Sequence, residues 1–302
     1  MKKIFLISML ILACVVLTAD EMPWLKYDNL KLGSEKSLDI MTWNIQKFPK
    51  HKFAVELAAN TIMAIDADVI GLQEIKSAKH FEQVIKILQT EDPEDGWQGY
   101  RANTSVCNLN LAFVYKSAIL SQINIYEIYA DDEKYHSPFP RKPLVMEFTY
   151  ANEDYVVINN HLKAKAGKKN EKRRKRAMQL LKEYVDRNLA DEEVFVLGDL
   201  NDNLADAPKD NVFSGILNDP ENYQFVDIKI ANDSMSDWSY PYWKYRSHLD
   251  HIIITNELFD EFETNGSEIR VIPLAKFMKG GDDARYKYLT DHRPVFLKLM
   301  IK

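Results

Sequence analysis

The chain has 302 residues, of which 46% are hydrophobic, 28% charged and 11% aromatic, with 10 Gly and 11 Pro. This composition is typical of an ordinary folded protein and excludes a disordered chain or a fibrous repeat. The formal net charge of -6 argues against a protein that coats nucleic acid by bulk electrostatics, but leaves a local basic track open.

The first segment along the chain is an apolar run that follows two lysines. Residues 4–17 are apolar except for Ser8, and this length is short for a membrane span but fits a signal peptide. We expect residues 1–19 to be a signal peptide cleaved after Ala19, so that the protein is secreted or periplasmic. Alternatively, Cys14 carries the lipid of a bacterial lipoprotein, and the protein is then anchored to a membrane.

After removal of the signal peptide, Cys107 is the only cysteine. No intramolecular disulfide can then form. Because the sequence VCNLNLAFVY around Cys107 resembles the entry to a strand, an inert buried residue is favoured over a catalytic thiol.

Six short apolar runs share one design, in which polar residues stand at one end. They are LDIMTWN ending at Asn44, DVIGLQE ending at Glu74, YVVINNH ending at His161, VFVLGD ending at Asp199, LDHIIIT beginning with Asp250 and His251 after its leucine, and TDHRPVFLKL with Asp291 and His292 near its start. Such runs indicate strands buried on both faces. Polar groups at the ends of such strands occupy the place where open α/β sheets keep their chemistry. Six of them together indicate a site.

Helix-like stretches alternate with these runs. Apolar residues at three- and four-residue spacing predict helices over residues 53–65 and 81–88, and a third helix with Ala177, Leu181 and Val185 on one face. The order strand, helix, strand recurs in both halves and predicts two packed sheets with helices outside. No Pro/Gly/Ser-rich linker divides the chain, so residues 20–302 are expected to form one domain.

Two further segments suggest contacts with a substrate. Residues 232–247 are rich in aromatic residues, which either stack on bases and sugars or cap the core, and the two interpretations weigh evenly. The basic run KAKAGKKNEKRRKRAM, residues 163–178, follows His161 directly. We interpret it as a track for phosphates in preference to a solvated loop and helix start.

The residue types at the strand ends suit a hard divalent cation. Mg²⁺ takes oxygen ligands and commonly binds through one or two carboxylates plus a substrate phosphate. Glu74 and Asp291 are the candidates, and Asn44, Asp199 and Asn201 offer further oxygens. A soft-metal site is disfavoured because the chain has no cysteine pair and no HExxH spacing.

Phosphodiester hydrolysis requires an aligned water molecule, neutralisation of the phosphate charge and stabilisation of the leaving oxygen. Two histidines, together with the residues above, can meet these requirements. If His292 is hydrogen-bonded to a carboxylate such as Asp250, its imidazolium is favoured and can bind or protonate a phosphate oxygen. His161 occupies a similar polar position at a strand end.

Short motifs along the chain follow one another in a characteristic order. They are WNIQ at 43–46, LQEI at 72–75, NNHL at 159–162, GDLND at 198–202, LDHI at 249–252 and TDHRPV at 290–295. In this order they resemble the endonuclease/exonuclease/phosphatase superfamily over roughly the whole processed chain. The resemblance implies a deoxyribonuclease I-like, four-layer α/β sandwich of two mixed sheets packed face to face. It also implies Mg²⁺-dependent attack of water on a phosphoester, with Mn²⁺ or Ca²⁺ as alternative ions.

The resemblance implies a role for each matching residue. The metal-side residues are Asn44, Glu74 and Asp291. The catalytic residues are His161, which is similar to a phosphate-binding histidine, Asp199 and Asn201, which are similar to the pair holding water and phosphate, and the dyad of Asp250 and His292. The substrate-binding residues are Lys76 and Arg141, at the places of two arginines of secreted deoxyribonucleases, and Lys163 in the basic run.

One stretch departs from the pattern of secreted deoxyribonucleases. Those enzymes carry a glutamate that orients the first histidine, whereas this chain has Asn108, Leu109 and Asn110 there. The departure leaves the orientation of His161, and a strict deoxyribonuclease assignment, open.

The leading hypothesis is an exported, Mg²⁺-dependent phosphodiesterase that hydrolyses DNA or RNA, because the basic run and the aromatic segment adjoin the catalytic set. A monomer without a stable protein partner is expected, with membrane contact only through a lipid anchor. The alternative is a phosphatase or sphingomyelinase-like phosphodiesterase acting on lipid or inositol phosphates. A non-catalytic binding module ranks last, because the metal-side carboxylates and both histidines are present.

Overall fold

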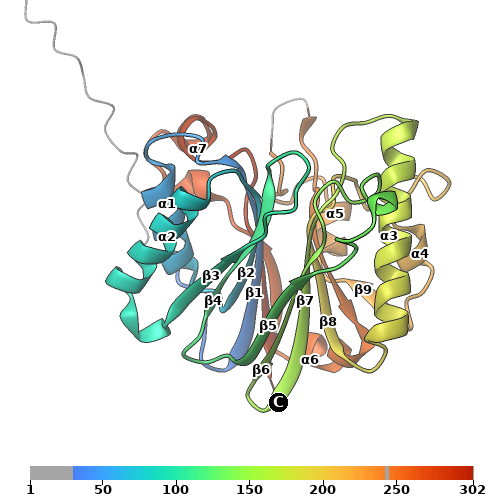
Figure 1. Ribbon diagram of the computed structural model, residues 1–302, viewed down its shortest axis with the longest axis horizontal. Coiled ribbons are helices and arrows are strands. Elements are labelled where there is room, and N and C mark those ends of the chain that lie inside the picture. The colour runs from blue at the N-terminus through green and yellow to red at the C-terminus, as the bar shows by residue number, and fades with distance from the viewer. Residues whose placement is uncertain (1–29, 242–244, 302) are drawn as a thin grey trace, which may run out of the picture.

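In a computed structural model, which describes residues 30–241 and 245–301, two sheets pack face to face between outer helices (Figure 1). The predicted signal peptide, residues 1–19, and the alternative lipid-bearing Cys14 lie outside the described residues.

The first sheet has six strands in the order β11-β12-β1-β2-β4-β3. Their bounds are Glu268–Val271 for β11, Val295–Met300 for β12, Ser37–Phe48 for β1, Val69–Ile75 for β2, Asn110–Lys116 for β4 and Trp97–Arg101 for β3. Strands β1 and β2 are parallel, and β12 is antiparallel to β1, so the sheet is mixed.

The second sheet also has six strands, in the order β5-β6-β7-β8-β10-β9. Their bounds are Ser121–Glu127 for β5, Leu144–Tyr150 for β6, Glu153–His161 for β7, Glu193–Asp199 for β8, Asp250–Thr255 for β10 and Tyr223–Phe225 for β9. Strands β7 and β8 are parallel, and β10 is antiparallel to β8.

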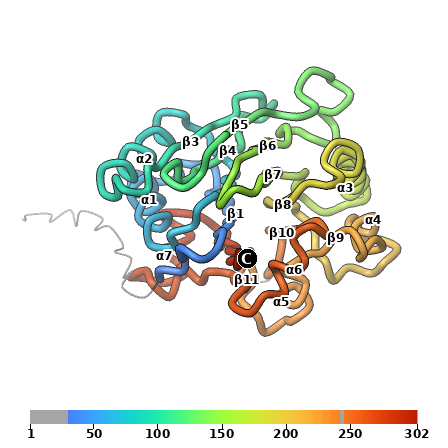
Figure 2. Tube along the Cα trace, turned by 90° about the horizontal axis from the view of Figure 1, so that it is seen from below, coloured from blue at the N-terminus to red at the C-terminus, as the bar shows by residue number. Residues whose placement is uncertain are grey.

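Most helices form the two outer layers (Figures 1 and 2), whereas the short helix Phe259–Glu263 packs Phe259 and Phe262 against the core between the sheets. The bounds of the helices are Ala54–Ile65 for α1, Ala78–Glu91 for α2, Lys168–Asn188 for α3, Ser214–Leu217 for α4, Ile228–Asn232 for α5, Phe259–Glu263 for α6 and Gly281–Tyr288 for α7. Buried residues of α1, α2 and α7 pack on the first sheet, and those of α3 and α4 pack on the second. Among the described residues, no helix combines the length and apolar character that a membrane crossing requires.

Strand alternation explains the layers. Ile40 of β1 points into the core between the sheets, whereas the next residue, Met41, packs with the helices on the other side. Phe195 and Leu197 of β8 project into the same core from the second sheet. The predicted four-layer sandwich of two mixed sheets is confirmed, and all six apolar runs are strands.

The strand directions bring the polar ends of the six runs together. The carboxyl ends of parallel neighbours lie at one edge of a sheet, and an antiparallel neighbour begins at that same edge. Accordingly, Asp250 at the start of β10 pairs with Asp199 at the end of β8, and His161 at the end of β7 pairs with Asp199 from the other side.

A buried amide contact ties the two sheets together below this edge. The Nε2 of Gln73 on β2 donates to the Oδ1 of Asn159 on β7 at 2.9 Å, and the Nδ2 of Asn159 donates to the Leu72 carbonyl at 3.1 Å. Both amides are closed to solvent. Since hydrogen bonds between buried groups demand defined geometry, this contact fixes how the sheets meet directly under the polar strand ends.

The prediction that Cys107 is buried is wrong. The thiol is exposed, because Cys107 lies in a turn that precedes β4, and the strand begins only at Asn110. The apolar pattern around it belongs to the strand that follows.

Candidate active site

The Oδ2 atom of Asp199 lies at the centre of the polar cluster. The Asn44 Nδ2 donates a hydrogen bond to it at 2.8 Å, so a residue of the first sheet contacts one of the second. The Nε2 atoms of His161 and His292 lie 3.3 Å and 3.8 Å from the same oxygen. Burial raises the pKa of Asp199 to about 7, because the positive charge of His292 offsets only part of the desolvation.

The predicted metal-side residues surround this centre on the first sheet. The Oε2 of Glu74 accepts from the Lys47 backbone N–H at 2.9 Å, and the Oδ2 of Asp291 accepts from the Gln46 Nε2 at 2.7 Å. The second Asp291 oxygen, Oδ1, is buried and has no hydrogen-bond partner within the described parts of the chain. A buried carboxylate oxygen of this kind is suited to bind a cation or an ordered water.

The carboxylate oxygens around Asp199 suit a hard divalent cation. Glu74, Asp199 and Asp291 all contribute carboxylates to one pocket, which is the donor set that Mg²⁺ prefers. Asp199, Asp250 and His292 also bring ligand atoms within 4.8 Å of one another. However, His292 already uses its Nδ1 to bond the Asp250 carboxylate at 2.6 Å, so Glu74 and Asp291 are the better candidates for holding the ion.

Asp250 and His292 form a buried dyad. Asp250 is closed to solvent and stands behind His292, which lines the pocket. Burial lowers the pKa of His292, but the carboxylates of Asp250 and Asp199 outweigh it and raise that pKa to about 10. The ring is therefore an imidazolium at neutral pH.

His161 has the opposite electrostatic setting. Burial, together with the charges of Arg141 and His292, holds its pKa well below the usual range, so the ring is neutral. Its Nε2 faces the Asp199 carboxylate, whereas its Nδ1 is buried without a partner among the residues that the structure describes. The absent partner agrees with the missing glutamate at residues 108–110.

Several residues at the site adopt left-handed backbone conformations that non-glycine residues rarely occupy. They are Gln46 with φ of 41°, Lys47 with 51°, Glu74 with 66° and Asn201 with 56°. Each costs free energy unless the surroundings enforce it, and such residues concentrate at functional sites. All four line the same pocket as Asp199, which agrees with a functional site there.

The converging groups line a pocket of about 600 Å³. The predicted residues that line it are Asn44, Glu74, His161, Asp199, Asn201, Asp291 and His292. The three predicted substrate-binding residues are not among its lining residues: Lys76 is exposed, Arg141 is buried with its Nη1 3.4 Å from the Leu162 carbonyl, and the Lys163 Nζ donates to the Ala164 carbonyl at 3.0 Å.

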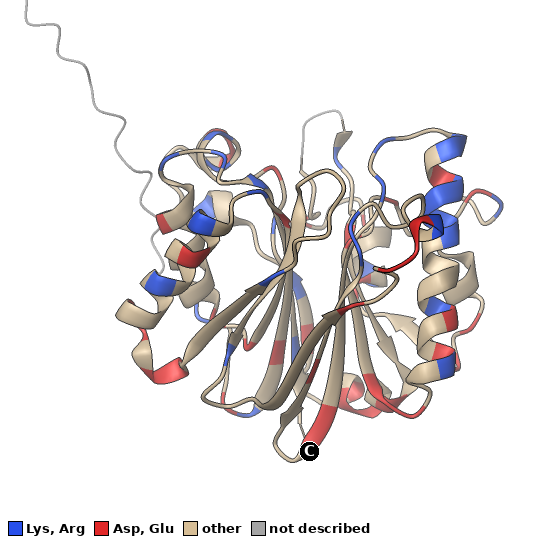
Figure 3. Cartoon of the chain, viewed as in Figure 1, with Lys and Arg blue, Asp and Glu red and all other residues tan. Residues whose placement is uncertain are grey.

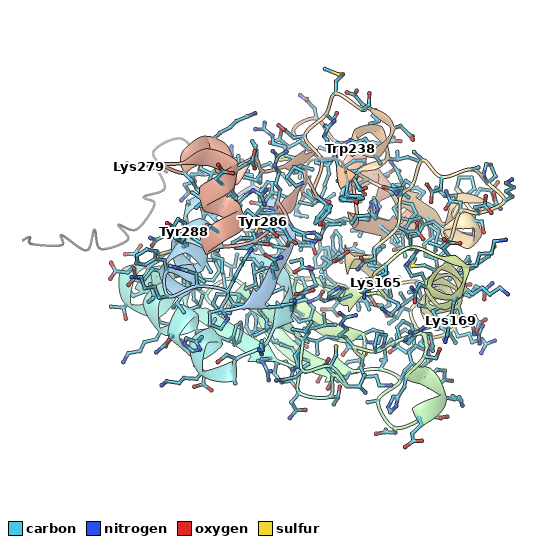
Figure 4. The ribbon with its side chains drawn as sticks, turned by 90° about the horizontal axis from the view of Figure 1, so that it is seen from above. Lys165, Lys169, Trp238, Lys279, Tyr286 and Tyr288 are labelled. Atoms are coloured by element: carbon cyan, nitrogen blue, oxygen red, sulfur yellow. The ribbon has the colours of Figure 1, made fainter. Side chains whose placement is uncertain are left out.

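Side chains from the basic run and the aromatic segment, which had no individual roles in the sequence prediction, also line the pocket. They are Lys165 and Arg174 from the basic run and Tyr240 and Tyr245 from the aromatic segment. Arg174 donates to the Oδ2 of Asp202 at 2.8 Å. Basic residues gather on the end of α3 that lies beside the strand ends (Figure 3), and Lys165 and Lys169 lie across from Tyr286 and Lys279 when this end is viewed from above (Figure 4).

The aromatic segment, residues 232–247, fits both interpretations, since some of its rings lie at the pocket and others pack on the protein. Tyr240 lies 5.0 Å from the His292 ring, centroid to centroid, and Tyr245 is 70% exposed at the pocket. Trp238 instead donates its indole N–H to the Ile230 carbonyl at 3.0 Å and lies under the Arg246 guanidinium. Tyr242 and Trp243 lie outside the described residues.

A family model described as the Endonuclease/Exonuclease/phosphatase family matches residues 41–292 of the chain. A comparison with curated protein sequences finds no match.

Three solved structures illustrate the likeness in fold. TDP2 from D. rerio, complexed with a single-strand DNA product, has a TM-score of 0.62 at 14% identity, covering 87% of this chain and 99% of that chain. The human nocturnin catalytic domain with bound sulfate has a TM-score of 0.61 at 17% identity, covering 87% and 93%. A family protein from Leptotrichia buccalis C-1013-b has a TM-score of 0.62 at 14% identity, covering 87% and 100%. At these identities the likeness concerns the fold.

Proposed function

Because the chain belongs to the endonuclease/exonuclease/phosphatase family, whose members are phosphoester hydrolases that generally depend on divalent metals, we propose that it is a Mg²⁺-dependent phosphodiesterase acting on nucleic acid. The single observation that carries the proposal is the convergence of Asn44, His161 and His292 on one carboxylate oxygen of Asp199. Export through the signal peptide of residues 1–19 is part of the proposal and is supported by the two lysines and the apolar run.

Asp199 is the proposed base. A pKa of about 7 is close to neutral pH, so a substantial fraction of this carboxylate is ionised there while it still accepts a proton efficiently. In the proposed reaction a water oxygen bonds to phosphorus, the ester P–O bond breaks, and the proton of the water passes to Asp199. Asn201, whose backbone N–H is held by the Asp199 Oδ1 at 3.1 Å, orients the phosphate beside it.

His292 is the proposed charge partner of the phosphate. Its imidazolium, sustained by Asp250, faces the pocket and can donate from Nε2 to a phosphate oxygen or protonate the leaving oxygen. A cation held by Glu74 and Asp291 would polarise the phosphoryl oxygens and offset the negative charge of the transition state. Magnesium is the proposed ion, since the candidate ligands are all oxygens.

The rim of the pocket supports nucleic acid as the substrate class. Positive charge extends from the pocket along the start of α3, through Lys165, Lys169 and Arg173. Such a row of cations suits the phosphodiester backbone of nucleic acid. Tyr240 and Tyr245, which also line the pocket, offer rings for stacking. The D. rerio TDP2 structure, which has a similar fold and holds a single-strand DNA product, is consistent with this choice.

A screen of phosphoester classes tests the proposal. Purified protein is incubated with plasmid, single-stranded DNA, RNA, sphingomyelin vesicles and inositol phosphates, each with Mg²⁺ or with EDTA. We expect Mg²⁺-dependent cleavage of at least one nucleic acid, and its loss in Asp199→Ala. Turnover of lipid or inositol phosphates alone would show that nucleic acid is not the substrate. Turnover without a metal ion would refute the mechanism.

A further inference from the structure

A second cluster of titratable side chains lies behind the pocket. It consists of Asp227, which follows β9, His248, which precedes β10, and His251, the second residue of β10; we call these three the buried triad. The exposed fractions of their surfaces are 0%, 2% and 0% in that order. Their ring and carboxylate atoms approach within 4.8 Å of one another, yet none of the three lines the pocket.

His251 bonds an acceptor at each ring nitrogen. Its Nδ1 lies 2.6 Å from the Asp227 Oδ2, and its Nε2 lies 2.9 Å from the backbone carbonyl oxygen of Asp202. Since neither a carboxylate nor a carbonyl can donate a hydrogen, both ring nitrogens must carry one, and the ring is an imidazolium. Burial alone lowers the pKa of His251, but the Asp227 carboxylate outweighs this and raises it.

His248 has the neutral form. Its Nδ1 accepts from the backbone N–H of Ser239 at 3.2 Å, so its hydrogen is on Nε2 and is donated to the Asp227 Oδ2 at 2.8 Å. The remaining oxygen of Asp227 accepts from the Ile252 backbone N–H at 3.2 Å. The triad thus contains one anion and one cation, and every polar atom has a partner.

This pattern distinguishes the triad from a metal centre. A metal needs ring nitrogens free of hydrogen, whereas here the nitrogens nearest Asp227 both donate to its carboxylate. The His251 Nε2 is also committed, to a backbone carbonyl.

The triad is connected to the active site first through the loop of residues 199–202, which it contacts by a hydrogen bond. Asp202 is held from two sides: His251 bonds its carbonyl at 2.9 Å, and Arg174 bonds its carboxylate at 2.8 Å. Directly before it stands Asn201, with its left-handed backbone. Two buried cations therefore hold the end of the loop that presents Asp199 and Asn201 to the pocket.

The triad also reaches the dyad of Asp250 and His292. His248 accepts from the Ser239 N–H, and the Ser239 Oγ accepts from the backbone N–H of Asp250 at 3.1 Å. The Ser239 carbonyl accepts from the N–H of Arg293, the residue after His292, at 2.7 Å. One serine thereby joins the triad to both chain segments that carry the dyad.

We propose that the buried triad is a set of positioning residues that fixes the 199–202 loop relative to the Asp250–His292 dyad. The triad touches no substrate; it sets the distance between the base and the charged histidine, which act together on one phosphate. This role rests on the proposed function. Small displacements of reacting groups reduce rate steeply, so the effect of the triad is expected in kcat and not in substrate affinity.

The protonation pattern is tested without any turnover. In wild-type protein with ¹⁵N-labelled histidine, at pH about 8 and thus above the ordinary histidine value, we expect His251 to carry hydrogens on both nitrogens and His248 on Nε2 alone. A neutral His251 with one bare nitrogen would overturn the proposal, as would a stoichiometric transition metal bound to these rings in the purified protein.

Two variants of His251 separate positioning from folding. In His251→Gln the side-chain amide nitrogen occupies the position of Nε2 and can still donate to the Asp202 carbonyl. In His251→Asn it occupies the position of Nδ1, so it can donate to Asp227 but not to Asp202. With bis(p-nitrophenyl) phosphate as substrate, we expect His251→Asn to lower kcat about tenfold or more and His251→Gln less than about threefold, with KM nearly constant in both. Equal losses that follow the melting temperature would overturn the proposal.

The backbone amide signals of Asn201 and Asp202 give a readout that needs no activity. They should shift in His251→Asn and stay near their wild-type positions in His251→Gln; identical spectra for the two variants would contradict the positioning role. If the wild type cleaves no phosphoester, the proposed function fails, but these signals and the histidine spectra still decide whether the triad holds the loop. If either variant does not fold, the wild-type histidine spectra decide alone.

Discussion

His292 Nδ1 lies 2.6 Å from the Oδ2 of Asp250, and both side chains are buried. The contact joins the start of β10 in one sheet to the segment that leads into β12 in the other. It sustains a positive charge beside Asp199, whose own carboxylate is costly to ionise because of burial. The packing of the two sheets thus places a lasting cation next to a titratable base.

We expect Asp250→Asn to shift the alkaline limit of activity to lower pH. The His292 pKa is about 10 largely because of Asp250, so removal of this charge lowers it. Since the imidazolium is the active form, activity is present below this pKa and lost above it. The profile of kcat against pH measures the shift, with Asp283→Asn on the exposed face of α7 as control. An unchanged alkaline limit would show that His292 does not act as a cation.

Glu74→Gln should weaken metal binding. The substitution keeps the size and the hydrogen bond from the Lys47 N–H but removes a charge from the proposed ion site. Isothermal titration with Mn²⁺ should show an affinity lower by about tenfold or more. Glu171→Gln, at another carboxylate that lines the same pocket, serves as the matched control, and equal losses in the two variants would place the ion elsewhere.

The approach of the two sheets predicts a cost for one added methyl group. A Cβ on Gly71 would lie 2.5 Å from the Leu197 Cδ1 and 3.1 Å from the Asn159 Cγ. Gly71→Ala should therefore lower the free energy of unfolding by about 1–3 kcal/mol, as overpacking does. Urea denaturation measures this loss. Gly215→Ala, where an added Cβ meets nothing within 4 Å, should be nearly neutral, and equal values for both would contradict the packing.

Replacement of Lys165 and Lys169 by alanine should weaken DNA binding in a salt-dependent manner. Each lost phosphate contact reduces the slope of log affinity against log salt by about one. Fluorescence anisotropy with single-stranded DNA measures the slope, in an Asp199→Asn background that prevents cleavage. Lys229→Ala, on α5 and away from the pocket lining, is the control. A slope unchanged from that of the background protein would argue against a track along α3.

The sequence predicted those features that depend on local pattern. Apolar runs of strand length identified β1, β2, β7, β8, β10 and β12, and their polar ends identified the pocket. The edge strand β5 was not predicted, because its exposed positions leave no continuous apolar run. Hydrophobic periodicity reports burial, so strands with little of it escape detection.

Contacts between distant segments could not be predicted from pattern. Asp227 and His251 are 24 residues apart, and nothing in the local sequence of either indicates the other. Arg174 appeared only as one cation of a basic run, although it is 3% exposed and bonded to Asp202. Helical spacing places it on the buried face, three residues before Ala177, but only the folded chain shows the Asp202 carboxylate that neutralises its charge there.

Co-crystallisation with Mn²⁺ and an anomalous difference map would locate the metal in the pocket. We expect one strong peak there, bound by oxygens of Glu74 and Asp291 and close to Asp199. A peak between Asp227, His248 and His251, or a pocket that stays without metal at saturating Mn²⁺, would contradict this placement of the ion.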